Sequence, residues 1–234
     1  MTSLALGPIS LGTQPRIIGS LESAVPLNIL KTLQQQGVTL LECRADLFTT
    51  PLEETLSYLD TIRALGGFGL LGTLRETPQN QNTRIQQFQT MLPHIDGIDI
   101  EIDTPIRDEV ITLAQQTKKT VMVSFHDYAG TPSSKELQDL LNTGISAKAD
   151  IVKIAVMAHS PEDVISLLNF THLNNQHQLI TIAMGPWGSL SRLASPLFGS
   201  LMSYGYITQS VAPGQLSVLE LATAFKQHYP SFTH

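Results

Sequence analysis

The chain has 234 residues, of which 42% are hydrophobic and 15% are charged, and its formal net charge is −6. This length suits one large α/β domain, and the apolar content is enough to bury a core, which excludes a disordered chain. A mildly acidic chain of this kind is poorly suited to binding nucleic acid or anionic membranes.

Short apolar, β-branched runs alternate with longer segments of helical periodicity along the chain. The starts of these runs are spaced by roughly 20 to 30 residues, the size of one strand–helix unit with its loops. The predicted strands are Ile17–Leu21, Thr39–Arg44, Gly69–Arg75, Gly97–Ile102, Val121–His126, Ile151–Val156, Leu179–Met184 and Tyr204–Gln209.

Each strand is followed by a segment with helical spacing of apolar residues, such as Leu27, Leu30 and Leu33 in the first. Several of these segments begin with Ser, Thr or Pro, which are typical of a helix cap or first turn. The predicted helices are Pro26–Gln36, Leu52–Leu65, Thr83–Met91, Pro105–Gln116, Ser134–Thr143, Pro161–Asn169, Ser191–Met202 and Ser217–His228.

Eight strand–helix pairs predict an α/β fold of the closed (β/α)8 or TIM-barrel type, in a single domain over residues 1–234. An open doubly wound sheet is the competing fold. It would usually carry a Gly-rich phosphate loop after an early strand, and the sequence has none. Residues 1–16 are punctuated by Gly and Pro and are expected to form an extra hairpin or arm covering one barrel end.

The single cysteine, Cys43, excludes an intrachain disulfide and a Cys-x-x-Cys metal site. Residues 1–19 lack a basic start followed by a continuous apolar core, so we expect no signal peptide. No apolar run reaches the length of a membrane span. These features predict a cytoplasmic enzyme or binding domain.

Charged and polar residues interrupt several of the apolar strands. Alternation along each strand gives shared faces to Glu42, Arg44 and Asp46, to Thr73 and Arg75, to Asp99 and Glu101, and to Ser124 and His126, while Lys153 is central in its strand. Charges inside an apolar run are costly unless they are paired or functional. A barrel would bring these residues together at the carboxyl ends of its strands, where barrel active sites lie.

Lys153 is the only one of seven lysines that lies within a strand of β-branched and small apolar residues. Burial disfavours the charged form of a lysine, and nearby cations such as Arg44 or Arg75 would act in the same direction. A lysine that loses its proton can attack a carbonyl group. The alternative is a structural lysine that reaches solvent or pairs with Glu42 or Glu101.

His126 is the only one of seven histidines that ends an apolar strand. It precedes Lys153 by one strand and is expected to face it across the barrel mouth. A lysine nucleophile beside a histidine that moves protons is the pairing that imine chemistry requires. The alternative is a structural histidine bonded to Asp99 or Asp127, although such a partner could equally orient a catalytic imidazole.

Two further segments carry polar groups suited to ligand binding. Arg192 begins a predicted helix and could bind a carboxylate in bidentate fashion, or be an ordinary surface arginine. The loop 212–215 follows the eighth strand and could close over a ligand, with Gln215 supplying hydrogen bonds, or be a plain turn. No metal is expected, because no His-x-x-x-His or Glu-x-x-His spacing occurs on a helix and arginines adjoin Asp99 and Glu101.

Ten short motifs occur in a specific order and spacing. They are Leu41–Asp46, Gly72–Arg75, Asp99–Glu101, Ser124–Asp127, Thr131–Pro132, Asp150–Ala155, Met184–Gly185, Ser191–Arg192, Phe198–Ser200 and Ala212–Gln215. On these motifs the chain resembles the type I 3-dehydroquinate dehydratase family over nearly its full length. The resemblance implies a (β/α)8 fold and a homodimer. It also implies a lyase of the shikimate pathway that converts 3-dehydroquinate to 3-dehydroshikimate without a cofactor.

The resemblance also implies roles for individual residues. Lys153 resembles the imine-forming lysine, His126 the general acid/base, and Asp99 a carboxylate that helps hold the histidine. The positions matched to substrate binding are Glu42, Arg44, Arg75, Arg192 and Gln215.

The chain departs from the family pattern at two positions. Gln79 stands where members often have a glutamate near the histidine, so Glu76 or Asp99 is expected to take more of that role. Val211 stands where a serine often contacts the substrate, and Ser210, one position earlier, is the replacement we expect.

Two other functions remain open on the residues alone. Another Schiff-base barrel, such as a class I aldolase, would share Lys153 but usually needs a phosphate site near the seventh and eighth strands. A catalytically silent ligand-binding barrel is the alternative from a different class, and the presence of both Lys153 and His126 argues against it.

Overall fold

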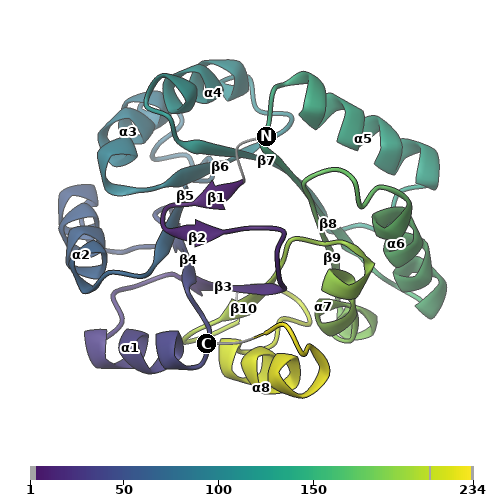
Figure 1. The fold of residues 1–234 in the computed structure, drawn as a ribbon. Coiled ribbons are helices and arrows are strands. Elements are labelled where there is room, and N and C mark those ends of the chain that lie inside the picture. Colours follow the sequence, from purple (N-terminus) through teal and green to yellow (C-terminus); the bar gives the residue numbers. More distant parts are fainter. Residues whose placement is uncertain (1–3, 211, 233–234) are drawn as a thin grey trace.

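The computed structural model describes residues 4–210 and 212–232, and their parallel strands form a nearly closed barrel (Figure 1). The strands of the described chain are β3 (Arg16–Leu21), β4 (Leu40–Arg44), β5 (Gly69–Thr73), β6 (Gly97–Glu101), β7 (Thr120–Asp127), β8 (Ile151–Met157), β9 (Leu179–Met184) and β10 (Met202–Tyr206), in the order β10-β3-β4-β5-β6-β7-β8-β9. The two end strands of this order, β10 and β9, are linked by a hydrogen bond from Leu201 N–H, just before β10, to Leu179 C=O at 2.9 Å. The predicted (β/α)8 fold is confirmed.

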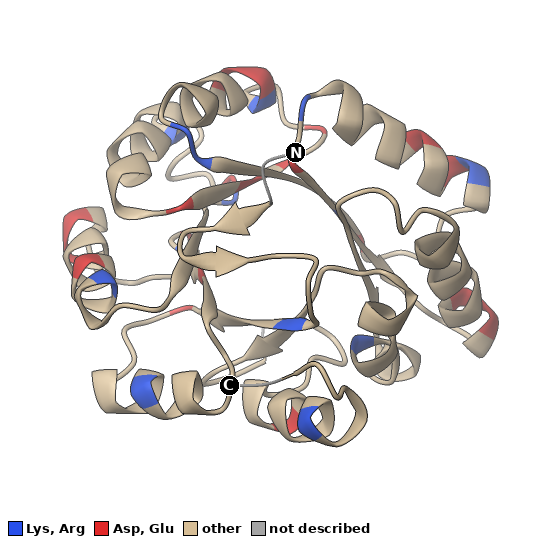
Figure 2. Ribbon diagram, viewed as in Figure 1, with Lys and Arg blue, Asp and Glu red and all other residues tan. Residues whose placement is uncertain are grey.

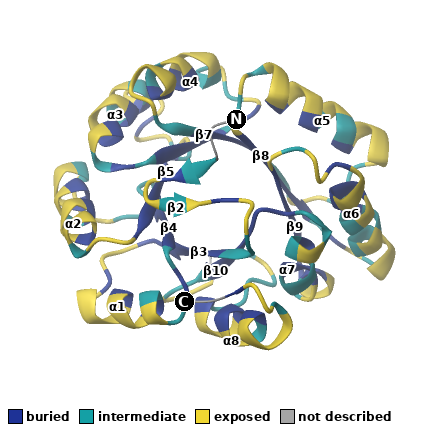
Figure 3. Cartoon of the chain, in the orientation of Figure 1, coloured by how far each residue is buried: buried dark blue, intermediate teal, exposed yellow. Residues whose placement is uncertain are grey.

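An outer ring of helices surrounds the strands (Figure 1). They are α1 (Leu27–Gln35), α2 (Leu52–Leu65), α3 (Arg84–Met91), α4 (Arg107–Gln116), α5 (Ser134–Ser146), α6 (Pro161–Leu173), α7 (Ser191–Ala194) and α8 (Val218–His228), with 3-10 turns η1 (Leu92–His94), η2 (Pro186–Gly188) and η3 (Ser195–Phe198). Ser133, Ser160 and Ser217 form capping boxes that fix the starts of α5, α6 and α8. Many charged residues lie on this ring (Figure 2), and the strands inside it are mostly buried (Figure 3).

The predicted helix Ser191–Met202 is wrong in its second half. Helix α7 gives way to the 3-10 turn η3, which contains Pro196, a residue without an N–H to donate. The turn then ends at Gly199, whose φ of 113° is in the left-handed region. Met202 is already the first residue of β10, so this strand starts and ends earlier than the predicted Tyr204–Gln209.

The lumen of the barrel changes character along its axis. Its amino-terminal half is filled by buried apolar side chains, which include Ile18, Leu40, Leu71, Met122, Ile151 and Ile180. The polar strand residues identified in the sequence lie nearer the carboxyl ends. The amino-terminal half of the lumen is therefore part of the hydrophobic core, and the carboxyl-terminal half is the place for a functional site.

An antiparallel hairpin of β1 (Ala5–Leu6) and β2 (Ile9–Ser10) covers the amino-terminal end of the barrel (Figure 1). Leu6 and Leu11 are buried in the apolar cluster of the lumen. Thr120 Oγ1, at the start of β7, donates to Ala5 C=O at 2.8 Å. The predicted hairpin is confirmed, although the first three residues of the predicted segment lie outside the described chain. No helix in the described ranges is long and apolar enough to cross a membrane.

Candidate active site

A cavity of about 220 Å³ lies at the carboxyl ends of the strands. Its lining residues are Ser20, Glu42, Arg44, Arg75, Glu101, His126, Tyr128, Lys153, Ala155, Ile182, Met184, Arg192, Tyr204, Ala212 and Gln215. Of the residues predicted for the site, Asp99 lies directly behind this wall in contact with Lys153, and Ser210 lies outside the cavity. The fold thus gathers all the others around one space.

Strand register sets the relative heights of the two central residues. In the parallel pairing of β7 with β8, Ser124 pairs with Lys153 and His126 pairs with Ala155. His126 is therefore two residues nearer the barrel mouth than Ser124, the residue that pairs with Lys153. The histidine lies on the neighbouring strand, above the lysine, instead of across the mouth.

Lys153 is 4% exposed and lies among carboxylates. Its Nζ donates to Asp99 Oδ2 at 3.1 Å, lies 3.7 Å from Glu42 Oε1, and is 4.0 Å from the centre of the Tyr204 ring. Asp99 and Glu42 are therefore its ion-pair partners; of the two partners suggested from the sequence, Glu42 and Glu101, only Glu42 is in place. Carboxylates at such distances stabilise an ammonium group, and only the free amine of a lysine can attack a carbonyl.

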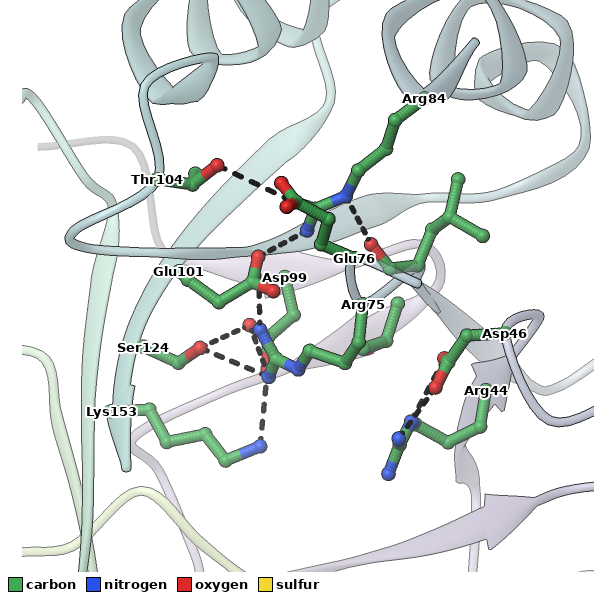
Figure 4. Close-up of polar contacts among 12 residues, drawn as sticks. Arg44, Asp46, Arg75, Glu76, Arg84, Asp99, Glu101, Thr104, Ser124 and Lys153 are labelled. Atoms are coloured by element: carbon green, nitrogen blue, oxygen red, sulfur yellow. Dashed lines mark hydrogen bonds and ion pairs between the residues drawn. The ribbon is translucent and has the colours of Figure 1, made fainter. Parts of the chain in front are cut away.

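Asp99 is fully buried and joins the lysine to its neighbours (Figure 4). Its Oδ1 accepts from Ser124 Oγ at 2.5 Å and from Arg75 Nη2 at 3.0 Å. Burial by itself raises the pKa of Asp99, but Arg75 and Lys153 hold it well below its usual value, so the carboxylate is ionised. The structure gives Asp99 no hydrogen bond to His126 within the described residues, and its direct contact is with the lysine.

The ion pairs continue outward from Asp99 as a row of alternating charges (Figure 4). Arg75 Nη1 lies 3.4 Å from Glu101 Oε2, and the same oxygen accepts from Arg84 Nη2. We call Lys153, Asp99, Arg75, Glu101 and Arg84 the charge row. The described ranges contain no group of three or more His, Cys, Asp or Glu residues that could hold a metal ion.

A second set of contacts holds Glu42 and Arg44 on β4 and Asp46 just after it. Glu42 is 3% exposed and accepts from Thr73 Oγ1 at 2.9 Å and from Ser20 Oγ at 3.2 Å. Arg44 makes two hydrogen bonds to Asp46, at 3.1 and 2.7 Å. Glu42 is thus fixed toward Lys153 by two hydroxyl groups.

The His126 ring is half-buried and stacks on Tyr128, with ring centres 6.4 Å apart and an interplanar angle of 16°. No hydrogen bond to the ring is found within residues 4–210 and 212–232. Burial lowers the pKa of His126 well below its usual value, and the nearby positive charges of Lys153 and Arg75 lower it further. The imidazole is therefore neutral near pH 7 and can accept a proton.

Arg192 is buried, at 2% exposure, so it is not the surface arginine that its sequence position also allowed. Its guanidinium donates to the backbone carbonyls of Gly214, Tyr204 and Pro213 at 3.0, 3.3 and 3.4 Å. Within the described residues it has no ion-pair partner, and burial lowers its pKa to about 10. A buried cation without a counter-ion at the cavity wall suits an anionic ligand.

Comparison with known proteins assigns the chain to a family. A family model described as type I 3-dehydroquinase matches residues 22–231. The chain belongs to this family. Its members are hydro-lyases, so this type I 3-dehydroquinase homologue is an enzyme of the lyase class.

Curated relatives and solved structures agree with this assignment. A 3-dehydroquinate dehydratase of Methanococcoides burtonii is 32% identical over 95% of this chain and 98% of its own length. That of Methanosarcina acetivorans is 34% identical, over 92% and 96%. The crystal structure of 3-dehydroquinate dehydratase from Geobacillus kaustophilus matches with a TM-score of 0.84 and 29% identity, over 98% of each chain. A type I 3-dehydroquinate dehydratase from Clostridium difficile, solved with covalently modified comenic acid, matches with a TM-score of 0.83 and 26% identity, over 96% and 97%.

The two departures from the type I 3-dehydroquinase pattern can be located in the structure. Gln79 and Glu76 are exposed, and Glu76 Oε2 lies 3.8 Å from Arg84 Nη1. In the described chain neither of them hydrogen bonds to His126. Asp99 acts on this ring through its charge, which raises the pKa of His126 against the larger effect of burial. Ser210 is exposed and donates to Ala212 C=O at 2.9 Å, and Val211 lies outside the described residues.

The loop after β10 is tied to the barrel on two sides. Thr208 Oγ1 donates to Glu22 Oε2 at 2.9 Å, at the end of β3. On the other side, Ser189 Oγ donates to Gly214 C=O at 3.3 Å, beside the bond from Arg192. The loop therefore holds Gln215 at the cavity wall in this type I 3-dehydroquinase homologue.

Sequence reasoning missed Ser20, Tyr128 and Tyr204 in the cavity wall, and Arg84 behind it. Tyr204 and Ser20 lie on lumen-facing positions that alternation could have found with the correct strand registers. Arg84 gave no signal, because it begins a polar helix outside the strands and meets Glu101 only in the folded barrel.

Proposed function

We propose that the protein dehydrates 3-dehydroquinate to 3-dehydroshikimate in the shikimate pathway, through a Schiff base on Lys153. The observation that carries the proposal is that buried Lys153, half-buried His126 on the neighbouring strand and buried Arg192 line one cavity. The family and its curated relatives supply the substrate. The Clostridium difficile structure, which contains covalently modified comenic acid, supports a covalent step.

The first half of the reaction forms the imine. Lys153 loses a proton and its Nζ attacks the ketone carbon, giving a carbinolamine. His126, neutral in the free site, carries protons while the carbinolamine loses water. The resulting iminium keeps the positive charge that Asp99 and Glu42 already balance in the ammonium state, so the pocket needs no new counter-ion.

The second half eliminates the substrate hydroxyl group. The iminium withdraws electrons from the adjacent carbon, and His126 removes a proton from that carbon to give an enamine. The enamine expels the hydroxyl group, which leaves as water with the proton returned by His126, and hydrolysis of the imine releases the product and Lys153. General acid–base assistance of this kind contributes on the order of 10²–10⁴-fold in rate.

The test of this function is an assay of the purified protein with 3-dehydroquinate, followed by the absorbance of the conjugated product. Turnover is the expected result. Absence of turnover by the folded protein would overturn the proposal. Retro-aldol activity on a sugar phosphate would favour an aldolase-type barrel instead, and ligand binding without turnover would favour a silent barrel.

Arg192 is proposed to bind the carboxylate of the substrate. Arg192→Met is expected to raise KM for 3-dehydroquinate by roughly 10- to 150-fold, the range for losing a hydrogen bond to a charged group. Steady-state kinetics measure this change, with Arg63→Met as a control because Arg63 pairs with Asp96 away from the cavity. An unchanged KM in Arg192→Met would assign carboxylate binding to another residue.

We also propose that the enzyme is a cytoplasmic homodimer. Large apolar side chains exposed in the segment from η2 to η3 support an interface, since Trp187, Leu190 and Leu197 are 53%, 71% and 75% exposed. Light scattering on the protein is expected to give twice the chain mass. The double variant Leu190→Glu/Leu197→Glu should give the chain mass, and a dimer that persists in it would place the interface elsewhere.

A further inference from the structure

Arg84 is a buried arginine that does not line the catalytic cavity. It is the first residue of α3, and its side chain is 1% exposed. Its guanidinium donates to Leu74 C=O at 2.7 Å, to Thr104 Oγ1 at 3.3 Å, and to Glu101. Burying a guanidinium is costly unless it is fully paired, and these contacts pair it at the ends of β5 and β6.

Each carboxylate of the charge row is shared between two cations (Figure 4). Glu101 Oε2 meets both Arg84 and Arg75, the latter at 3.4 Å. Asp99 meets Arg75 at 3.0 Å and Lys153 at 3.1 Å. Charges this close interact more strongly in a buried row than in water, so a change at one end alters the charge balance at the other.

We propose that Arg84 is a positioning residue that, through the charge row, makes Lys153 release its proton more readily. This inference rests on the proposed function, in which the free amine is the nucleophile. Arg84 neutralises part of the charge on Glu101, which leaves Arg75 turned toward Asp99.

Removal of Arg84 is expected to stabilise the ammonium form of Lys153. Glu101 then has one cation and draws Arg75 toward itself. Asp99, with a weaker contact to Arg75, attracts the Lys153 ammonium more strongly. The loss of a buried positive charge also stabilises the remaining ammonium, so both effects move formation of the free amine to higher pH.

The experiment measures the amine of Lys153 directly. The parent and Arg84→Met proteins are methylated with formaldehyde and cyanoborohydride across a range of pH, and the extent at Lys153 is read by peptide mass spectrometry. In Arg84→Met the midpoint of the pH dependence is expected to rise by about one unit, which makes Lys153 on the order of tenfold less reactive near pH 7. Arg84→Lys retains the charge and should restore the midpoint of the parent.

Arg107→Met is the matched control. Arg107 begins α4 and donates to Ile102 C=O at 2.7 Å, so it also cross-links the end of β6, but it lies outside the charge row. Its loss should leave the midpoint unchanged. A midpoint equal to the parent's in Arg84→Met, or an equal shift in Arg107→Met, would overturn the proposal.

A folding defect in Arg84→Met does not prevent the test. Glu101→Gln removes the carboxylate that competes with Asp99 for Arg75, so this variant is expected to lower the midpoint for Lys153 relative to the parent; an unchanged or raised midpoint would overturn the proposal. Turnover of 3-dehydroquinate is measured separately. Its absence in the parent would overturn the proposed function, whereas the labelling of Lys153 still decides the role of Arg84.

Discussion

Replacement of Lys153 with alanine is expected to lower kcat for dehydration of 3-dehydroquinate by about 10⁴- to 10⁶-fold, the range for losing a covalent nucleophile. The amine is the only group in the proposed mechanism that forms a bond to the substrate. Borohydride added with 3-dehydroquinate should reduce the imine and leave the ligand attached to the parent protein. Peptide mass spectrometry is expected to locate this adduct at Lys153.

Lys119→Ala is the control for this variant. Lys119 is another partly buried lysine, whose Nζ donates to Ile95 C=O at 2.6 Å, near the amino-terminal end of the barrel. Its replacement should preserve both turnover and trapping. Dehydration at the parent rate by Lys153→Ala, or trapping at a different lysine, would refute the Schiff-base mechanism.

Replacement of His126 with glutamine is expected to lower kcat by about 10²- to 10⁴-fold, because glutamine cannot carry the proton. Glutamine approximates the size of the ring and keeps Lys153 in place, so borohydride should still trap the ligand, only more slowly. His94→Gln, at an exposed pair with Asp60, is the control for loss of a histidine. Normal turnover in His126→Gln would remove the residue from the mechanism.

The pH behaviour of His126 follows from its surroundings. Burial, with help from Lys153 and Arg75, lowers its pKa well below the ordinary value. As pH falls through about 6.5, where a free histidine takes up a proton, this ring should stay neutral and become protonated only at lower pH. Nuclear magnetic resonance of labelled histidines, assigned with His126→Gln, measures this titration, and a midpoint at or above 6.5 would contradict it.

The sequence predicted the barrel well where side-chain periodicity reports burial. The bounds of α2 and β9 agree with the structure residue for residue, because their apolar faces pack on the core at regular spacing. The error around η3 has a local cause, since Pro196 and Gly199 end helical hydrogen bonding within a run whose composition suits a helix. The β-branched residues after Tyr206 likewise favoured a strand, although the chain there leaves the barrel.

Alternation along strands also predicted the charged strand residues around the cavity, because strand ends converge in a barrel whatever their distance in sequence. Partnerships between side chains were harder to predict. Asp99 was expected beside His126, yet it bonds to Lys153, and Arg84 reaches Glu101 from a helix. Arg192 donates to the backbone carbonyls of Pro213 and Gly214, in the loop after β10. Such contacts depend on side-chain reach and loop path, which spacing does not report.

The hairpin at the amino-terminal end of the barrel also limits the path by which water reaches and leaves the site. Leu6 and Leu11 pack onto the apolar half of the lumen, so the described barrel is closed beneath Lys153. Water released during imine formation must leave by the opening through which the substrate entered. The elimination releases a second water molecule, and the final hydrolysis takes one up. All three transfers of water therefore use the one opening at the carboxyl ends of the strands.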